Sequence, residues 1–532
     1  MNSNLKYYVA TLFLMSFFAP AQDFFVATTG NDGNPGTQAQ PWATITHALG
    51  NVPDGATIQV MDGTYEGTVT LVGDFTQGVL VRAQNPLQAV LENQGPVVVC
   101  TQAKGITLQG FEMRQTTFGG DPFVVEIRDG IGEPGGTDAV ERITLTGNVI
   151  HDSFSQDIVR IHGGAREIAV RGNVFYNQGP QTQAGEHVEI NGANDISVSD
   201  NVFFNDFEGS GRVNTNSFGS FVIVKNSEQL STVGDVDIRR NIFLNWQGFA
   251  EHSFITLGDE GLAFHEAVGV TIENNLMLGN ATHIMRSSFV IRGGSDILIR
   301  NNTISGDLPC LAYTVQMVRE GQNPVNDNVR FINNIWSDQA GTFGSRSPGD
   351  NQDFSDTPVA DTNSFTLNNN LYFNDDNAIP FDQFELINMT DDANAIEDDP
   401  LLMPPPENIT LPRWNGSAFL SGATSIRAEF ERLATTYGTP GPGSAVIGAG
   451  AEGPGDDLFG NTRGSVADVG AVEVNPCGAV IDLDGDNDLD LDDLYLMASR
   501  WTSDDDLTDL DDDNRVTVLD MTELENHRGS CD

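Results

Sequence analysis

One short pattern recurs eight times in the middle of this 532-residue chain. It reads apolar residue, spacer, apolar residue, two spacers, asparagine. Alternation with a period of two predicts a strand with one buried face, and an asparagine at a constant distance from the strand predicts a fixed bend. The spacing between repeats varies, which indicates loops of different length on a constant coil. The asparagines of the pattern are Asn148, Asn173, Asn201, Asn241, Asn275, Asn302, Asn334 and Asn370.

The repeat predicts a solenoid, and two kinds of solenoid end a strand in asparagine. A leucine-rich repeat requires leucine three positions before the strand, where this chain has residues such as Val140, Ala165 and Gly294. A second alternating segment precedes the repeats, for example at residues 125–128 and 159–162. We therefore expect an all-β fold, a right-handed parallel β-helix of about 11 coils and on the order of 50 Å long. The asparagine amides should stack into a ladder that joins neighbouring coils.

The first 21 residues predict export. Lys6, an apolar run and the small residues at 19–21 form a signal peptide, and an apolar run of about 12 residues is too short to span a membrane. The chain has 75 acidic and 26 basic residues, so its formal charge is −49, which disfavours nucleic acid as a partner. We expect a secreted protein, extracellular or associated with a cell surface, whose mature chain begins near Gln22.

The four cysteines fall into two pairs. Cys100 and Cys310 should lie roughly six coils apart, about 29 Å along the solenoid, which is beyond the reach of a disulfide. Both are therefore expected to be free, buried thiols. Cys477 and Cys531 bracket the acidic end of the chain. In an exported protein, a disulfide between them would clasp the two ends of one module.

Residues 25–37, 41–45 and 62–65 at the start of the solenoid, and 444–450, 457–463 and 468–473 at its end, resemble segments of pectate-lyase-like right-handed parallel β-helix proteins. The resemblance implies a β-helix domain over residues 22–476, with substrate held in a groove along one outer strand face. A short amphipathic cap is expected over residues 45–52, where it would close the end of the core.

Residues 477–532 are strongly acidic and repeat one spacing of oxygen ligands. Calcium takes six to eight oxygens, and a 12-residue loop supplies them from positions 1, 3, 5, 7, 9 and 12, with a backbone carbonyl at position 7. An acidic tail without structure would not repeat this spacing, so two Ca²⁺ sites are expected. The first set is Asp482, Asp484, Asp486, Asp488, Asp490 and Asp493, and the second is Asp509, Asp511, Asp513, Arg515, Thr517 and Asp520.

Each of these loops runs into a segment expected to be helical, residues 494–501 and 521–527. The duplicated loop and helix resemble type I dockerins, which implies a dockerin-like module at 477–532 and a cohesin-type protein as its partner. Asn487 and Asn514 stand where glycine is usual, and the partner-reading positions carry no hydroxyl residues. The ligand spacing therefore supports calcium binding more strongly than it supports the cohesin.

The outward residues of the second alternating segment are candidates for chemistry, because they would stack as columns over successive coils. A site for an acidic sugar needs groups that neutralise a uronate carboxylate, a base and an acid. We expect Lys225, beside groove arginines, to have its charged form disfavoured and to serve as a base. The catalytic candidates are Lys225, His162, Arg160 and His187, and the substrate-binding candidates are Arg128, Glu189, Asn191 and Arg292.

The alternative for these residues is a solvated face on which Glu126, Arg160 and Glu189 pair as neighbouring charges, each pair contributing about 0 to 1 kcal/mol. A further Ca²⁺ in the groove also remains an open alternative. An acidic pair, Glu186 and Glu189, lies in this region, but it lacks the lysine that follows such a pair in chondroitinase- and alginate-lyase-like enzymes.

Two functions of different class follow. The first is a polysaccharide-active enzyme, a lyase in preference to a hydrolase, which acts on an acidic glycan and is anchored to a complex or surface through its dockerin. The second is a non-catalytic carbohydrate-binding or cell-surface solenoid, because the known signatures of polygalacturonase-like hydrolases and pectate lyases are absent. The sequence does not specify the glycan.

Overall fold

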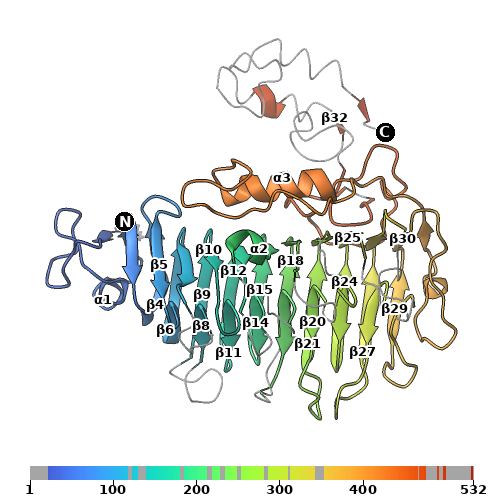
Figure 1. Cartoon of the computed structure of the whole chain (residues 1–532), viewed down its shortest axis with the longest axis horizontal. Coiled ribbons are helices and arrows are strands. Elements are labelled where there is room, and N and C mark those ends of the chain that lie inside the picture. Colours follow the sequence, from blue (N-terminus) through green and yellow to red (C-terminus); the bar gives the residue numbers. More distant parts are fainter. Residues whose placement is uncertain are drawn as a thin grey trace, which may run out of the picture.

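The chain folds into an elongated stack of parallel strands (Figure 1). The structure is a computed structural model that describes residues 22–117, 123–129, 139–179, 185–212, 219–227, 230, 234–247, 253–280, 285–308, 312–341, 353–464 and 466–474, together with 488–489, 495–498 and 529–530. Most coils contribute three strands, each paired in parallel with its counterpart in the next coil. We call the stacks the first, second and third ladders, in the order in which the chain passes through a coil. The predicted parallel β-helix is confirmed.

The first ladder contains the alternating segment that precedes the repeats. Two long strands, β4 (Val69–Ala83) and β6 (Val98–Gln109), each belong to two ladders. Their first halves lie in the first ladder, and their second halves lie in the second ladder. The first ladder continues through β8 (Val125–Arg128), β11 (Val159–His162), β14 (Val188–Asn191), β17 (Val222–Lys225), β20 (Ile255–Leu257), β23 (Phe289–Ile291) and β26 (Val315–Met317).

The second ladder consists of the repeat strands, and the third follows each asparagine bend. Besides β4 and β6, the second ladder contains β1 (Asp23–Val26), β2 (Thr57–Val60), β9 (Glu141–Thr146), β12 (Arg166–Arg171), β15 (Asn194–Ser199), β18 (Gly234–Arg239), β21 (Ala267–Glu273), β24 (Gly294–Arg300), β27 (Asp327–Ile332) and β29 (Phe365–Asn368). The third contains β3 (Gly63–Glu66), β5 (Ala89–Asn93), β7 (Glu112–Gln115), β10 (Val149–His151), β13 (Val174–Tyr176), β16 (Val202–Phe204), β19 (Ile242–Phe243), β22 (Leu276–Gly279), β25 (Thr303–Gly306), β28 (Ile335–Ser337), β30 (Leu371–Phe373) and β31 (Ile396–Glu397).

The repeat asparagines are fully buried at the bend between the second and third ladders. Asn201 shows the pattern: its Oδ1 accepts from the backbone N and the Nδ2 of Asn173 at 2.9 and 3.1 Å. Its Nδ2 donates to Val170 O at 2.9 Å and to Asn241 Oδ1 at 3.0 Å. Beyond the last repeat, the carboxylate of Asp392 accepts from the N and Nδ2 of Asn370. The predicted amide ladder is confirmed.

A short helix, α1 (Ile45–Leu49), covers the first end of the solenoid core. Thr44 caps the helix by accepting from His47 N at 3.2 Å. Ile45, Ala48 and Leu49 are buried against the first coils, so the predicted cap is confirmed. The two other short helical turns of the solenoid are α2 (Phe207–Ser210) and η1 (Met389–Asp391).

After the last coil the chain returns along the outer face of the third ladder, where α3 (Ile426–Gly438) lies across the strands (Figure 1). The Ser425 side chain caps this helix by accepting from Ala428 N. The helix packs Phe430, Leu433, Ala434 and Tyr437 against outward apolar residues that include Val149, Val174, Val202, Ile242 and Leu276. The sequence analysis did not predict this helix.

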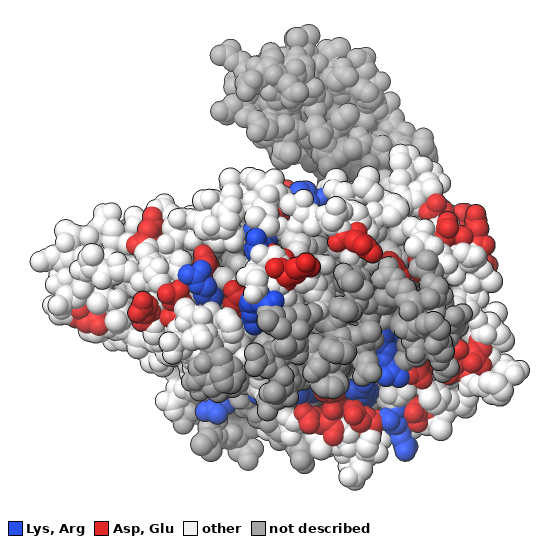
Figure 2. Space-filling model, viewed as in Figure 1, with Lys and Arg blue, Asp and Glu red and all other residues white. Residues whose placement is uncertain are grey.

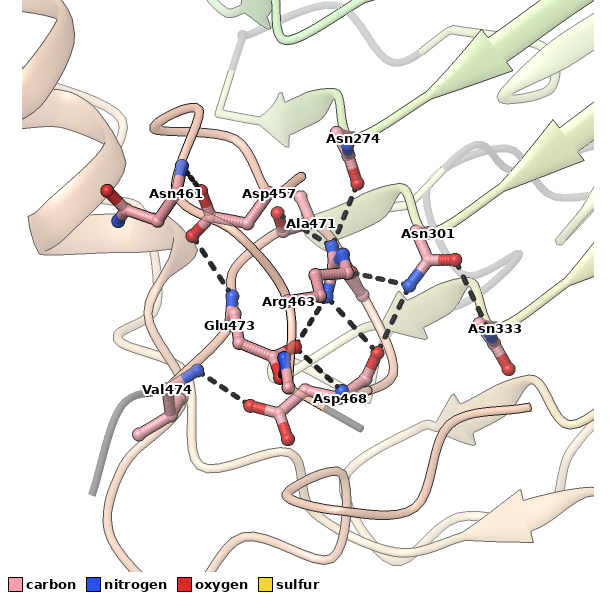
Figure 3. Close-up of polar contacts among 12 residues, drawn as sticks. Asn274, Asn301, Asn333, Asp457, Asn461, Arg463, Asp468, Ala471, Glu473 and Val474 are labelled. Carbon is pink, nitrogen blue, oxygen red and sulfur yellow. Dashed lines mark hydrogen bonds and ion pairs between the residues drawn. The ribbon is translucent and has the colours of Figure 1, made fainter. Parts of the chain in front are cut away.

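Arg463 fastens the end of the returning segment to the bends (Figure 3). Its guanidinium donates to Glu473 Oε2 at 2.9 Å and to Asn274 Oδ1 at 2.8 Å, and its side chain is only 2% exposed. Asn274 directly precedes a ladder asparagine and has φ 54°, a left-handed conformation that asparagine tolerates. The closing segment identified by resemblance is therefore held to the solenoid by a buried polar network.

Several sequence predictions lie outside the described residues: the signal peptide at 1–21, Cys310, Cys477, Cys531 and the calcium ligands other than Asp488. Within 477–532, β32 (Asp488–Leu489) pairs antiparallel with β33 (Gly529–Ser530), and residues 495–498 are helical. Cys100 is a free, buried cysteine, and burial raises the pKa of its thiol to about 12. No helix in the described ranges is long and apolar enough to cross a membrane.

Candidate functional site

The outward residues of the first ladder form the two predicted columns. The strand register aligns each residue with its counterpart one coil further on, about 4.8 Å away. One column runs Glu126, Arg160, Glu189, and the other runs Arg128, His162, Asn191, Lys225. Residues from four successive coils are therefore aligned on the outer side of the first ladder, where His162, Glu189 and Asn191 are nevertheless buried.

Three buried carboxyl groups lie together beside these columns. Asp157 and Glu186 each stand two residues before a strand of the first ladder, in successive coils, and Glu189 projects from the second of those strands. One ligand oxygen from each lies within 4.8 Å of the others, and all three residues are buried. Asp157 Oδ1 accepts from Glu186 N at 3.0 Å, and the Asp157 carboxyl group is hydrogen-bonded to the side chains of Glu186 and Glu189. We call this group the carboxylate triad.

Burial sets the charge of the triad. It raises the pKa of Asp157 well above the usual range, and the charges of Glu189 and Glu186 add to that effect. Burial also raises the pKa of Glu186 to about 7. Burial opposes ionisation of Glu189 as well, but the positive charges of Lys225 and Arg160 lower its pKa overall. At neutral pH the triad therefore holds protons that a cation would displace.

Two basic side chains border the triad. Lys225 Nζ lies 3.0 Å from Glu260 Oε1 and 3.9 Å from Glu189 Oε1. Arg160 Nε pairs with Glu189 Oε1 at 3.1 Å, and its guanidinium carbon lies 4.9 Å from the centre of the Phe123 ring. The predicted pairing of Arg160 with Glu189 is thus present, but it belongs to a buried cluster and not to a solvated face.

The expectation that the charged form of Lys225 is disfavoured is wrong. Burial alone would lower its pKa, but the carboxylates of Glu189, Glu186 and Glu260 raise it overall. The ion-pair partners of Lys225 are both acidic, and Arg292, expected beside it, pairs with other carboxylates. Arg292 pairs with Asp259 at 2.6 Å and with Glu320 at 3.4 Å.

His187 is not a groove residue, which corrects its assignment as a catalytic candidate. It is fully buried, and its ring lies 5.0 Å from Phe221 and 5.8 Å from Phe203. Burial lowers its pKa to about 3, so the ring stays neutral. His187 directly precedes β14, and the residues that directly precede β11 and β17, Ile158 and Phe221, also point into the core.

The other candidates remain in the two columns, where His162 and Asn191 are buried and Arg128 is exposed. His162 Nε2 lies 3.1 Å from Glu126 Oε1, and Arg128 is exposed at the end of β8. Asn191 Nδ2 donates to Glu189 Oε1 at 3.0 Å and to Ser227 Oγ at 2.6 Å, so it fixes the orientation of a triad member. Basic and acidic side chains also lie side by side in small groups on the face drawn in Figure 2.

The triad fits a divalent cation. Hard cations such as Ca²⁺ take carboxylate oxygens, and the three residues offer one ligand oxygen each within 4.8 Å of the others. The residues that would hold the ion are Asp157, Glu186 and Glu189. Sequence reasoning noted the two glutamates without assigning them to a metal, and it missed Asp157. The available signal was their position, because Asp157 and Glu186 both stand two residues before a strand of the first ladder.

No curated protein sequence matches the chain. A family model described as "Protein of unknown function (DUF1565)" matches residues 28–70. Among solved structures, pectate lyase Pel9A gives a TM-score of 0.49 at 15% identity and covers 86% of this chain and 97% of that chain. XylC with xylose gives 0.42 at 13%, covering 72% and 87%. An alginate lyase from Paenibacillus sp. str. FPU-7 gives 0.41 at 15%, covering 55% and 91%. At these values the likenesses carry no argument about the reaction.

Proposed function

We propose that this chain is a polysaccharide lyase that cleaves an acidic glycan at the carboxylate triad and its bordering bases. The observation that carries the proposal is the meeting of Lys225 and Arg160 with the triad on adjacent coils of one outer face. A lyase that acts on uronates must neutralise the sugar carboxylate, remove the neighbouring proton and protonate the leaving oxygen. Positive groups and proton carriers are both present here.

A divalent cation bound by the triad would supply positive charge for the uronate carboxylate. Arg160 provides further positive charge, and Arg128 can hold a second carboxylate through its planar guanidinium. Lys225 Nζ is the candidate base: neutralising Glu189 and Glu186 would weaken the negative field that retains its proton, and Glu260, 3.0 Å away, would have to be neutralised as well before the amine could accept the proton next to the uronate carboxylate. His162, bonded to Glu126, is the remaining group that can carry a proton to the leaving oxygen.

The test is incubation with a panel of uronate polysaccharides in the presence of Ca²⁺, followed by the ultraviolet absorbance of unsaturated products. A lyase releases such products from at least one member of the panel. Retained glycan binding with no product from any member would favour the alternative, a non-catalytic carbohydrate-binding solenoid.

A glycoside hydrolase is the second candidate, and one observation favours it. The pKa of Glu186 is raised to about 7 while that of Glu189, in the same cluster, is lowered. Two carboxyl groups with pKa values driven apart are the arrangement by which an acid and a nucleophile or base share a hydrolase site. A hydrolase would release reducing ends without ultraviolet absorbance, so the same incubation distinguishes the two reactions.

We further propose that the protein is secreted and is anchored through a dockerin-like module at 477–532. The support is the duplicated spacing of oxygen ligands, which begins at Asp482 and again at Asp509. Two Ca²⁺ ions would fold the module, a Cys477–Cys531 disulfide would clasp it, and a cohesin-type protein would be its partner. Pull-down of the full chain by a cohesin panel, with Ca²⁺ and with chelator, tests the anchoring role.

A further inference from the structure

The face that carries the triad continues past the last strand of the first ladder. Gln316 of β26 forms a parallel bridge with Asp356, and the side chains are joined by a hydrogen bond from Gln316 Nε2 to Asp356 Oδ2. Asp356 therefore extends the outward column of the first ladder by one coil. Two residues further on, Pro358 forms an antiparallel bridge with Glu385. This bridge adds the segment around Phe384 to the same edge.

Three apolar side chains are exposed at this edge. Val359 is 65% exposed, Phe381 65% and Phe384 75%. The bridge between Pro358 and Glu385 places Val359 directly opposite Phe384 in the antiparallel pairing. We call Val359, Phe381 and Phe384 the aromatic platform. The two phenylalanines are the most exposed aromatic side chains in the described part of the solenoid.

Four acidic residues lie on the two segments that carry the platform. Glu385 and Asp382 belong to its segment, and Asp353 and Asp356 lie on the facing one. Arg286 approaches Asp356 only at 3.8 Å. Apolar rings stack on the C–H faces of sugars, while carboxylates accept hydrogen bonds from hydroxyl groups. The local negative charge would repel a uronate, so this end of the face suits an uncharged sugar ring.

We propose that the aromatic platform is a subsite that stacks a neutral sugar residue of the same glycan that reaches the carboxylate triad, an inference that rests on the proposed function. Four strand spacings, about 19 Å, separate Lys225 from the level of Asp356, and the platform lies a few residues beyond Asp356. A glycan that spans this distance carries its uronate at the triad and its neutral residue at the platform. The natural substrate is accordingly a heteropolysaccharide and not a pure polyuronate.

The test uses native gel electrophoresis of the full chain in gels that contain neutral polysaccharides, namely a galactan, a xylan and a mannan. The wild type should be retarded by at least one of them, and Phe384→Ala should bind it roughly tenfold more weakly, as expected for loss of one aromatic contact. Phe381→Ala should also weaken retardation. Leu420→Ala is the matched control, because Leu420 is 45% exposed but lies elsewhere on the surface.

The outcome separates this inference from the proposed function. If Phe384→Ala loses retardation but still cleaves a uronate polysaccharide, both stand. If no acidic glycan is cleaved but retardation still depends on Phe384, the platform stands and the lyase assignment fails. Equal retardation of wild type and Phe384→Ala, or no retardation by any neutral polysaccharide, would overturn the platform. So would a dimer of the wild type that Phe384→Ala converts to a monomer, because the patch would then bind a second copy.

Discussion

Truncation of one ladder asparagine tests whether the amide stack stabilises the solenoid. Asn201→Ala removes the acceptor of the Asn173 backbone N–H and the donor to Val170 O. Asn173 Nδ2 retains its bond to Leu145 O, and Asn241 Oδ1 retains the Asn201 backbone N–H. Two buried backbone groups therefore lose their side-chain partner. At about 1 to 3 kcal/mol for each, the expected loss of unfolding free energy is roughly 2 to 6 kcal/mol.

Equilibrium urea unfolding followed by far-ultraviolet circular dichroism measures this loss. The matched control is Asn194→Ala, on the same strand β15, because the Asn194 amide donates to the exposed neighbour Asp195. We expect the urea midpoint to fall clearly for Asn201→Ala and to change little for Asn194→Ala. Equal midpoints for the two variants would show that the amide stack does not contribute to stability in the way the geometry indicates.

Three further predictions concern the triad, the C-terminal module and the returning segment. Glu186 binds its proton more tightly in the folded state than in the unfolded chain. Stability without divalent cations should therefore fall as pH rises from 4.5 to about 7. The melting temperature should decrease over this pH range, and Glu186→Gln should make the decrease smaller. Chelator should abolish the folded-state circular dichroism spectrum of an isolated 477–532 module, and replacing Asp482 and Asp509 together should have the same effect. An unchanged spectrum would contradict the proposal that this module is dockerin-like. Arg463→Met should destabilise the solenoid by about 3 to 5 kcal/mol because it leaves a buried carboxylate unpaired, and an unchanged melting temperature would show that the closing network is dispensable.

The solenoid could be predicted from the sequence because the positions of the repeat show directly which side chains are buried. Alternating apolar residues must face the core, and a buried amide at a constant position must find partners in adjacent coils. The returning helix α3 was accessible in principle. Ser425 is a good N-cap, and Phe430, Leu433, Ala434 and Tyr437 follow a helical spacing. The segment follows a helical period, so the period-two pattern that marks the strands does not reveal it.

The candidate site was less predictable because it depends on residues just outside the strands. Simple alternation places His187 outward, whereas the residue directly before each strand of the first ladder turns into the core, as Ile158 and Phe221 do. Asp157 and Glu186 are 29 positions apart and meet only because successive coils stack in register. The same stacking gives Lys225 acidic neighbours, which spacing along the chain could not reveal.

The central claim is that Lys225 and the triad perform the reaction, and Lys104 and Lys225, the two lysines of the described solenoid, provide a matched comparison. Lys104 pairs with Glu141 at 3.5 Å, away from the triad. Lys225→Arg and Lys104→Arg both keep charge, but only the first removes a titratable amine from the site. On the uronate polysaccharide that the wild type cleaves, we predict that Lys225→Arg lowers kcat on the order of 10²- to 10⁴-fold with little change in binding, whereas Lys104→Arg retains wild-type turnover. Equal turnover of Lys225→Arg, Lys104→Arg and the wild type would contradict the account.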